Sequence, residues 1–113
     1  MHELSIAQSI VELAEKEARN HHAVLIEELE LEIGDLAGID QIALDFALES
    51  AIKGSLLENA RIVRQQIAGE GRCGDCESLF PVENLFSACP VCRSYAVKII
   101  KGKELRVKAL AVK

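Results

Sequence analysis

Four cysteines, arranged as two CxxC pairs, are the residues of this sequence whose spacing most directly predicts chemistry. Cys73 and Cys76 form the first pair, Cys89 and Cys92 form the second, and twelve residues separate the pairs. A CxxC turn aims two sulfurs at one point, and two facing turns supply the tetrahedron of thiolates that structural zinc favours. Because four protein ligands leave no open coordination position, this site is not expected to support zinc-dependent hydrolysis.

The cysteines have three other interpretations. A pair of disulfides is disfavoured in a reducing cytosol. A thioredoxin-like redox site needs a single CxxC near a helix start in a βαβ setting, which the pattern lacks. Iron also accepts four cysteine ligands, so the spacing favours zinc and leaves iron open. The surrounding segment has few apolar residues, and metal–ligand bonds are expected to replace the core that it cannot build.

The first three residues offer a second set of metal donors. A large side chain at His2 is expected to keep Met1 in place, so the α-amine, the His2 amide nitrogen and the His2 imidazole lie within two residues. The amine titrates near 7.7–8.0 and the imidazole near 6.5, so both are available near neutral pH. Amide coordination suits square-planar Ni(II) or Cu(II). The fourth position is open to the Glu3 amide, a carboxylate, a water or a partner's ligand, which suits a carrier. On residue content alone, an ordinary frayed terminus is the simpler interpretation.

Weaker metal candidates have simpler structural roles. Asp40 is expected to cap a helix, with a role as a nickel carboxylate left open. Adjacent histidines at 21 and 22 point in different directions on a helix and are interpreted as a solvated helix end. No Ser-His-Asp arrangement, phosphate-binding glycine loop or isolated reactive cysteine is evident, so we predict no catalytic activity.

Periodicity predicts the elements that must position these residues. A capping-box pattern, Ser5 with Gln8, is expected to open a helix that ends near residues 20–22. Alternation predicts strands at 28–33, 61–68 and 104–109. A second helix is expected from Asp40 to Gly54, with Ile42 and Phe46 among its apolar positions.

These elements predict an α+β fold in which two helices pack on a three-stranded mixed sheet, with an inserted zinc-ribbon domain holding the four cysteines. Residues 1–69 plus 102–113 would form the α/β domain, and residues 70–101, bounded by Gly69, Gly71 and Gly102, would form the zinc ribbon between two strands. The last strand would bring basic Arg106 and Lys108 beside an acidic sheet surface.

Composition narrows the functional class. The net charge is −5 and half of the residues are hydrophobic, which is typical of a folded domain. Acidic residues dominate positions 1–69, whereas nucleic-acid binding proteins usually carry a basic face. No apolar run approaches the roughly 18 residues of a membrane helix, and no secretory signal is evident. We therefore expect a cytoplasmic protein that binds neither nucleic acid nor membranes.

The sequence resembles the HypA/HybF family of hydrogenase maturation factors over essentially its whole length. The resemblance rests on the start Met1-His2-Glu3-Leu4-Ser5, on Gln8-Ser9, on Glu32-Ile33-Gly34-Asp35-Leu36, on the two CxxC pairs and on Glu104-Leu105-Arg106-Val107-Lys108. It implies a nickel metallochaperone that delivers Ni(II) to the large subunit of [NiFe]-hydrogenase. His2 would be the essential nickel ligand, with the Met1 amine and the Glu3 backbone as companions, and the four cysteines would bind zinc.

The same resemblance implies partners. These are a HypB-type GTPase, the [NiFe]-hydrogenase large subunit and, in some bacteria, urease maturation proteins. The zinc module lacks the histidines that some relatives carry there, and Leu48 replaces a phenylalanine of many relatives, interpreted as a change within the core. Alternatives are a zinc-ribbon adaptor without transferable metal and a nucleic-acid-binding ribbon. Monomer and homodimer both remain open.

Overall fold

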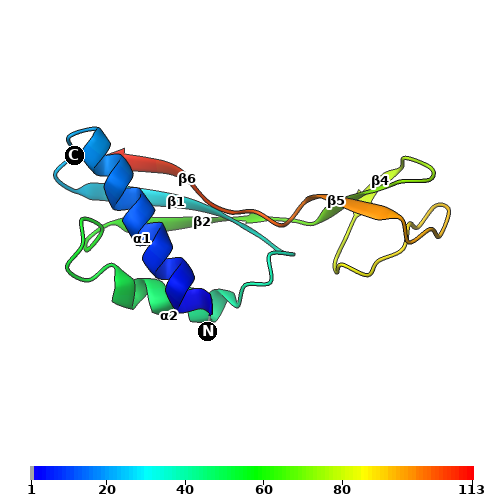
Figure 1. The fold of residues 1–113 in the computed structure, drawn as a ribbon, viewed down its shortest axis with the longest axis horizontal. Coiled ribbons are helices and arrows are strands. Elements are labelled where there is room, and N and C mark those ends of the chain that lie inside the picture. Colours follow the sequence, from blue (N-terminus) through cyan, green and yellow to red (C-terminus); the bar gives the residue numbers. More distant parts are fainter. Residues whose placement is uncertain (1) are drawn as a thin grey trace. The chain divides into compact units, whose positions relative to one another are not determined.

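The computed structural model describes residues 2–113, so Met1 lies outside the described residues. Figure 1 shows the order of the elements along the chain. They are α1 (His2–Asn20), β1 (Ile26–Gly34), α2 (Gln41–Ala51), β2 (Arg61–Ile67), β3 (Glu70–Cys73), β4 (Leu79–Pro81), β5 (Val97–Lys101) and β6 (Leu105–Val112).

The chain divides into two compact units. Unit 1 comprises residues 1–31, 39–64 and 106–113, and unit 2 comprises residues 32–38 and 65–105. One mixed sheet has the strand order β2-β1-β6, and the other has the order β4-β3-β5 with both pairings antiparallel. The predicted α+β fold, with two helices, a three-stranded mixed sheet and a four-cysteine insert, is confirmed. The predicted sheet strands differ from β2, β1 and β6 by a few residues at their ends.

The first helix begins earlier than the capping box predicted. It starts at His2 rather than at Ser5, so Ser5 lies inside the helix and does not cap it. A long-range contact supports the extra turn, because Glu3 Oε2 accepts a hydrogen bond from the Asp40 backbone N–H at 3.1 Å. An acidic side chain in the first turn also suits the positive end of the helix dipole. His2 and Glu3 therefore belong to a helical turn.

The core of unit 1 is aliphatic, as the low aromatic content requires. Three fully buried alanines of α1, at positions 7, 14 and 18, give that helix a smooth face, and α1 packs against α2. Small side chains let two helices approach closely. The other buried residues of this core are Ile10, Val11, Ile26, Leu29, Leu31, Leu44, Ala47, Leu48 and Leu57.

The second helix is capped as predicted but buries a different face. The Asp40 side chain accepts a hydrogen bond from the Ala43 N–H at 3.1 Å, which confirms its capping role. Leu44 and Leu48 are fully buried, whereas Ile42 and Phe46, predicted as apolar positions of the same helix, are exposed. Apolar residues occur on both sides of this helix, so periodicity alone could not decide which side faces the core.

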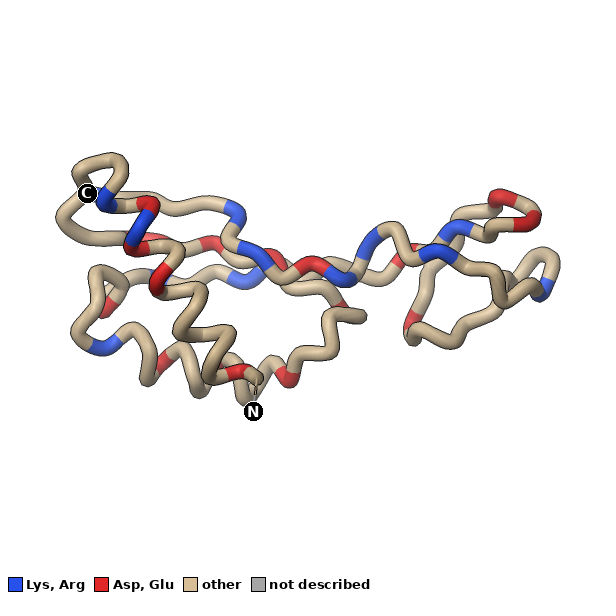
Figure 2. The backbone as a smooth tube through the Cα atoms, in the orientation of Figure 1, with Lys and Arg blue, Asp and Glu red and all other residues tan. Residues whose placement is uncertain are grey.

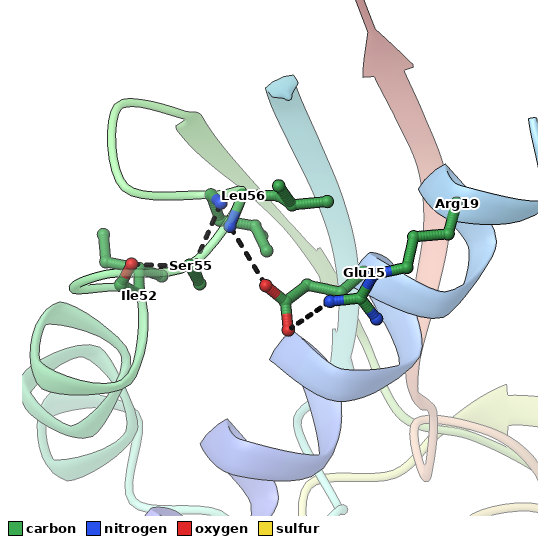
Figure 3. A network of polar contacts seen from close by, with 6 residues as sticks. Glu15, Arg19, Ile52, Ser55 and Leu56 are labelled. Carbon is green, nitrogen blue, oxygen red and sulfur yellow. Dashed lines mark hydrogen bonds and ion pairs between the residues drawn. The ribbon is translucent and has the colours of Figure 1, made fainter. Parts of the chain in front are cut away.

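A polar network fixes α1 against the segment that follows α2 (Figure 3). Glu15 Oε2 accepts a hydrogen bond from the Leu56 N–H at 3.0 Å, and Glu15 Oε1 lies 3.7 Å from the Arg19 guanidinium. Ser55 Oγ donates to the Ile52 carbonyl oxygen at 2.7 Å and accepts from the Leu57 N–H at 3.0 Å. A charged acceptor strengthens such a bond.

Ion pairs connect the outer strands of the first sheet to β1. Lys108 Nζ on β6 lies 3.7 Å from Glu30 Oε2, as expected for a basic strand beside an acidic sheet surface. Arg61 on β2 lies 4.0 Å from Glu28. Exposed pairs of this kind each contribute at most about 1 kcal/mol, so they favour the strand order more than they stabilise the fold.

Unit 2 has its own small core and a close backbone crossing. Cys73, Phe80, Val82 and Cys89 are buried together, and Leu36 packs against them. Gly34, Gly69 and Gly102 meet where the chain enters and leaves this unit, and we call this contact the glycine crossing. A Cβ on Gly34 would lie 2.0 Å from the Gly102 oxygen, and one on Gly102 would lie 2.7 Å from the Gly69 Cα. Gly102 also has a positive φ of 111°. Only glycine fits these positions.

In the part of the chain that the structure describes, neither helix has the length and apolar character needed to cross a bilayer.

Candidate metal centre

The first CxxC pair lies in a tight turn between β3 and β4. Cys73 Sγ accepts hydrogen bonds from the Asp75 and Cys76 N–H groups at 3.3 and 3.4 Å. The Cys73 N–H donates to the Ser78 carbonyl oxygen, and the Glu77 N–H donates to the Cys73 carbonyl oxygen, both at 3.0 Å. Glu77 takes a positive φ of 62° to close the turn. The backbone of the turn thus aims the sulfurs toward one point.

The second pair repeats this geometry bond for bond. Cys89 Sγ accepts from the Val91 and Cys92 N–H groups at 3.4 and 3.5 Å. The Cys89 N–H donates to the Ser94 carbonyl oxygen, and the Arg93 N–H donates to the Cys89 carbonyl oxygen, both at 2.8 Å. Arg93 takes a positive φ of 66°, in the position that Glu77 has in the first turn. Two matching turns therefore face each other.

The four sulfurs converge to the dimensions of a metal site. All four Sγ atoms lie within 4.8 Å of one another, with 3.5 Å between Cys73 and Cys92 and 3.6 Å between Cys76 and Cys89. A zinc–sulfur bond of about 2.3 Å implies tetrahedral edges of about 3.8 Å. The cysteines are free, at distances well beyond the roughly 2.05 Å of a disulfide. The cluster thus fits a tetrahedral ion held by four thiolates.

Other contacts join the two turns and support the sulfurs. The Ser94 hydroxyl donates a short hydrogen bond to the Asp75 carboxylate, which links one turn to the other. Cys76 Sγ lies 3.2 Å from Ser78 Oγ. Gly74 is required for close packing, because a Cβ there would lie 2.9 Å from the Ala96 carbonyl oxygen. The two serines and Asp75 were not singled out from the sequence, since small polar residues near a CxxC carry no distinctive spacing.

The electrostatics of the cluster favour a bound cation. Hydrogen bonds from the Ser78 hydroxyl and backbone lower the pKa of Cys76 to about 6. The Cys76 backbone N–H lowers the pKa of Cys73. For Cys92, the Ser94 backbone N–H favours the thiolate, but the neighbouring sulfurs and burial outweigh it and raise the pKa to about 12. Fewer than four thiolates therefore form readily without a cation to offset their repulsion.

The N-terminal candidates have a different setting. His2 is exposed in the first turn of α1, and the Glu3 side chain is bonded to the start of α2. Met1, the third residue of the predicted nickel set, lies outside the described residues. Among residues 2–113, the four cysteines are the one group of three or more metal-ligating side chains that lie close together. A nickel site that uses backbone nitrogens has no side-chain cluster to detect.

Comparison with known proteins matches the whole chain to one family. The family model described as "Hydrogenase/urease nickel incorporation, metallochaperone, hypA" matches residues 1–112. A hydrogenase maturation factor HypA of Parabacteroides distasonis is 64% identical over 113 residues, covering 100% of this chain and 98% of its own. That of Geobacter sulfurreducens is 42% identical over 112 residues, covering 99% of each chain.

Solved structures give the same result. The solution structure of the Ni metallochaperone HypA from Helicobacter pylori has a TM-score of 0.73 and 29% identity, covering 99% of this chain and 97% of its own. A second solution structure, of a HypA protein, has a TM-score of 0.75 and 29% identity, covering 100% of this chain and 97% of its own. These similarities extend over both compact units.

Proposed function

Because this chain belongs to the HypA family of hydrogenase/urease nickel-incorporation metallochaperones, we propose that it binds Ni(II) at its N-terminus and delivers the ion during maturation of [NiFe]-hydrogenase. The donors are the Met1 amine, the His2 amide and imidazole nitrogens and the Glu3 backbone nitrogen. Square-planar nitrogen coordination is the geometry that Ni(II) favours. The ion is cargo, bound where the chain ends and is open to a partner.

The start of α1 at His2 is the observation that carries this proposal. The first N–H groups of a helix have no acceptor within the helix. The His2 and Glu3 amide nitrogens therefore take no part in the i→i−4 hydrogen bonds of the helix, and an ion can bind there without breaking one of those bonds. The positive end of the helix opposes a cation, but each amide proton that the metal displaces leaves a negative charge. The Glu3 carboxylate, held beside the start of α2, adds to that offset.

The cysteine cluster is proposed to hold a resident Zn(II) through Cys73, Cys76, Cys89 and Cys92. Zinc supplies a structural cross-link between the two turns, with no open coordination position. In this proposal residues 70–101 act as a zinc-ribbon domain, and residues 1–69 plus 102–113 act as the nickel-binding domain. The protein works as a non-catalytic cytoplasmic carrier. Its partners are a HypB-type GTPase, the hydrogenase large subunit and, where present, urease maturation proteins.

A nickel titration tests the proposal. Zinc-loaded protein with its native N-terminus is titrated with Ni(II) beside two variants, His2→Ala and a chain with one extra residue before Met1. We expect one nickel per wild-type chain, with the absorption band of square-planar Ni(II), and loss of that band in both variants. His21→Ala is the matched control, because His21 is also an exposed histidine, in the turn directly after α1, and lies 3.4 Å from Glu17.

Two outcomes would reject the proposal. Equal binding by wild-type protein and His2→Ala would move the nickel site elsewhere in the chain. No binding by any form would favour the alternative, a zinc-ribbon interaction adaptor without transferable metal. Retention of zinc and of the melting temperature in both variants is required, because the N-terminal donors are proposed to play no part in the cysteine cluster.

A further inference from the structure

The two cysteines of each CxxC turn differ in burial. Cys73 and Cys89, the first of each pair, are both 1% exposed and lie in the core of unit 2 beside Phe80. Each of these buried sulfurs also accepts two backbone N–H bonds within its own turn. Cys76 and Cys92, the second of each pair, are exposed. A reagent in the solvent therefore meets the cysteine cluster first at Cys76 and Cys92.

Each exposed sulfur lies beside a buried sulfur of the facing turn. Cys76 Sγ lies 3.6 Å from Cys89 Sγ. Cys92 Sγ lies 3.5 Å from Cys73 Sγ, and we call these two contacts the cross-turn pairs. A disulfide bond is about 2.05 Å long, so the sulfurs of each pair need to approach by about 1.5 Å. Four cysteines allow three disulfide connectivities. In the one that matches these contacts, both bridges cross between the turns and each joins an exposed cysteine to a buried one.

Contacts that involve no sulfur also hold the two turns face to face. The Ser94 hydroxyl donates a hydrogen bond to the Asp75 carboxylate. The Gly74 N–H donates to the Ala96 carbonyl oxygen at 2.7 Å. Chemical change at the sulfurs leaves both of these hydrogen bonds intact. The cross-turn pairs therefore stay adjacent during a reaction that removes the metal.

The charge around the cysteine cluster is balanced. Residues 70–101 contain four acidic and four basic residues, and Figure 2 shows the two kinds interspersed along unit 2. Such a surface neither attracts nor repels an ionic reagent strongly. An exposed thiolate with a second thiolate beside it suits a small uncharged oxidant, a hydroperoxide, because the first thiolate attacks the peroxide and the second resolves the product.

We propose that hydrogen peroxide oxidises the cysteine cluster through its two cross-turn pairs, so that the metal is released as two disulfides form. The bridges are Cys76–Cys89 and Cys73–Cys92. This inference rests on the zinc site of the proposed function.

The same two steps take place at each cross-turn pair. The exposed thiolate attacks one peroxide oxygen, the O–O bond breaks and hydroxide leaves, which gives a sulfenic acid. The buried thiolate then attacks that sulfur, the S–S bond forms, the S–O bond breaks and a second hydroxide leaves. Two thiolates thereby lose two electrons, the peroxide gains them, and two protons from the solvent convert the hydroxides to water.

Cross-turn bridges have a structural consequence that bridges within the turns lack. They close the chain between residues 76 and 89 and between residues 73 and 92, so they replace the metal as the link between the turns. Bridges within each CxxC pair would close only short loops and leave the turns unlinked. A thiol reductant restores the four thiolates, and with them the metal site. Peroxide thus exchanges one cross-link of unit 2 for another, reversibly.

Oxidation of the zinc-loaded full chain tests the proposal. The protein is treated with increasing hydrogen peroxide, and released zinc is measured with a colorimetric indicator. We expect bound zinc to fall from one per chain to none at about two peroxides per chain. The amide NMR signals of unit 2 should stay dispersed, and dithiothreitol with added zinc should restore the starting spectrum. Reduced protein stripped by a chelator is the matched control, and its unit 2 should lose that dispersion.

Digestion and tandem mass spectrometry identify the bridges. Cleavage before Asp75 and fragmentation at Pro90 separate the two members of each CxxC pair, so the three connectivities give different fragments. We expect the two cross-turn bridges from native protein, and a mixture of connectivities from protein that is oxidised in guanidinium. With less than one peroxide per chain, dimedone should label sulfenic acid at Cys76 and Cys92 only.

Four results would overturn the oxidation proposal. They are bridges within the CxxC pairs, a bridge between Cys73 and Cys89, zinc that stays bound in excess peroxide, and unfolding of unit 2 after oxidation. Normal zinc binding with any of these results would leave the proposed function intact. A reduced chain that binds no zinc would reject the proposed zinc site, and the bridges mapped in that chain would still decide the pairing.

Discussion

The cysteine cluster and the N-terminal turn differ in how their candidate metal donors are held. At the cluster, two matching turns aim four sulfurs to within 4.8 Å, and backbone N–H groups already hold Cys73 and Cys89. At the N-terminus, His2 is exposed, and the Glu3 carboxylate accepts a hydrogen bond from the Asp40 backbone N–H. The cluster has all its donors on side chains fixed by the fold. The terminal turn offers mostly backbone nitrogens at a chain end.

In the proposed function, this difference explains why the zinc ion would stay bound and the nickel ion would be released. While its cysteines stay reduced, a site whose ligands are fixed from two sides releases its ion only when the turns separate, which costs the folding of unit 2. A chain end can unwrap from an ion by rotating a few backbone bonds, without loss of either core. The proposed function thereby separates retention and release of metal, because it assigns each to its own compact unit.

Breaking the cluster should have the largest effect. Cys73→Ser removes a fully buried sulfur, which accepts two backbone hydrogen bonds in the turn. We therefore expect zinc content to fall from one per chain to near zero. Structural zinc contributes on the order of 10 kcal/mol to such small modules, and unit 2 should lose its fixed structure. Zinc analysis and amide NMR spectra test this expectation.

The helices of unit 1 should survive that change, because their core contains none of the cysteines. Far-ultraviolet circular dichroism that keeps the helical signal of α1 and α2 supports independent cores. Full zinc retention by Cys73→Ser would contradict the metal centre itself.

A smaller effect is expected when one hydrogen bond to a sulfur is removed. Ser78→Ala deletes the hydroxyl that lies 3.2 Å from Cys76 Sγ. Outer partners of metal ligands typically contribute about 10–100-fold in affinity, so zinc affinity should fall by about tenfold. Competition with a chelator measures this, and Ser87→Ala in the same unit is the control.

Ser78→Ala should also release zinc at a higher pH than the wild type does. The Ser78 hydrogen bonds lower the pKa of Cys76 to about 6, which favours the thiolate that binds metal. Without the hydroxyl the pKa of Cys76 rises, so protons compete with the metal at a higher pH. The midpoint of zinc release during acid titration should therefore move upward in pH. A midpoint that stays fixed would show that Ser78 contributes nothing to the thiolate.

The smallest effect on stability is expected at Asp40, beside the N-terminal turn. Asp40→Ala removes the cap of α2, so stability should fall by about 1 kcal/mol in chemical denaturation, whereas Asp40→Ser, which can also cap, should lose less. If Asp40 only caps, both variants bind nickel as wild type does. Loss of nickel affinity in both variants, with the cap retained in Asp40→Ser, would add the carboxylate to the donor set.

The sequence predicted best those features that depend on the spacing of a few neighbouring residues. Two CxxC pairs define a four-sulfur cluster wherever the connecting loop lies, and Asp40 before an apolar run defines a cap. The buried Leu48 also agreed with its interpretation as a core residue. These features depend on local geometry, which a few neighbouring residues determine.

Features that depend on tertiary contacts were missed or misplaced. The first helix was predicted to start at Ser5 but starts at His2. Its first turn is supported by the hydrogen bond between Glu3 and Asp40, which lies 37 positions away. The core side of α2 could not be chosen, because Ile42 and Phe46 are as apolar as the residues that are buried. Short β3, β4 and β5 lack enough alternation to be recognised, and nothing local shows that Leu36 packs in unit 2.

The glycine crossing has a consequence for the order in which the chain is made. Leu36 and Gly34 are synthesised long before Gly69 and Gly102, and the contact closes only when the last of these has emerged. Until then Leu36 has no core to join, because Phe80, Val82 and both buried cysteines come later in the chain. Segment 32–38 therefore cannot form its contacts in unit 2 until most of the protein has been synthesised. During synthesis, unit 2, which holds the cysteines, is therefore completed late, when Leu36 can pack against its core.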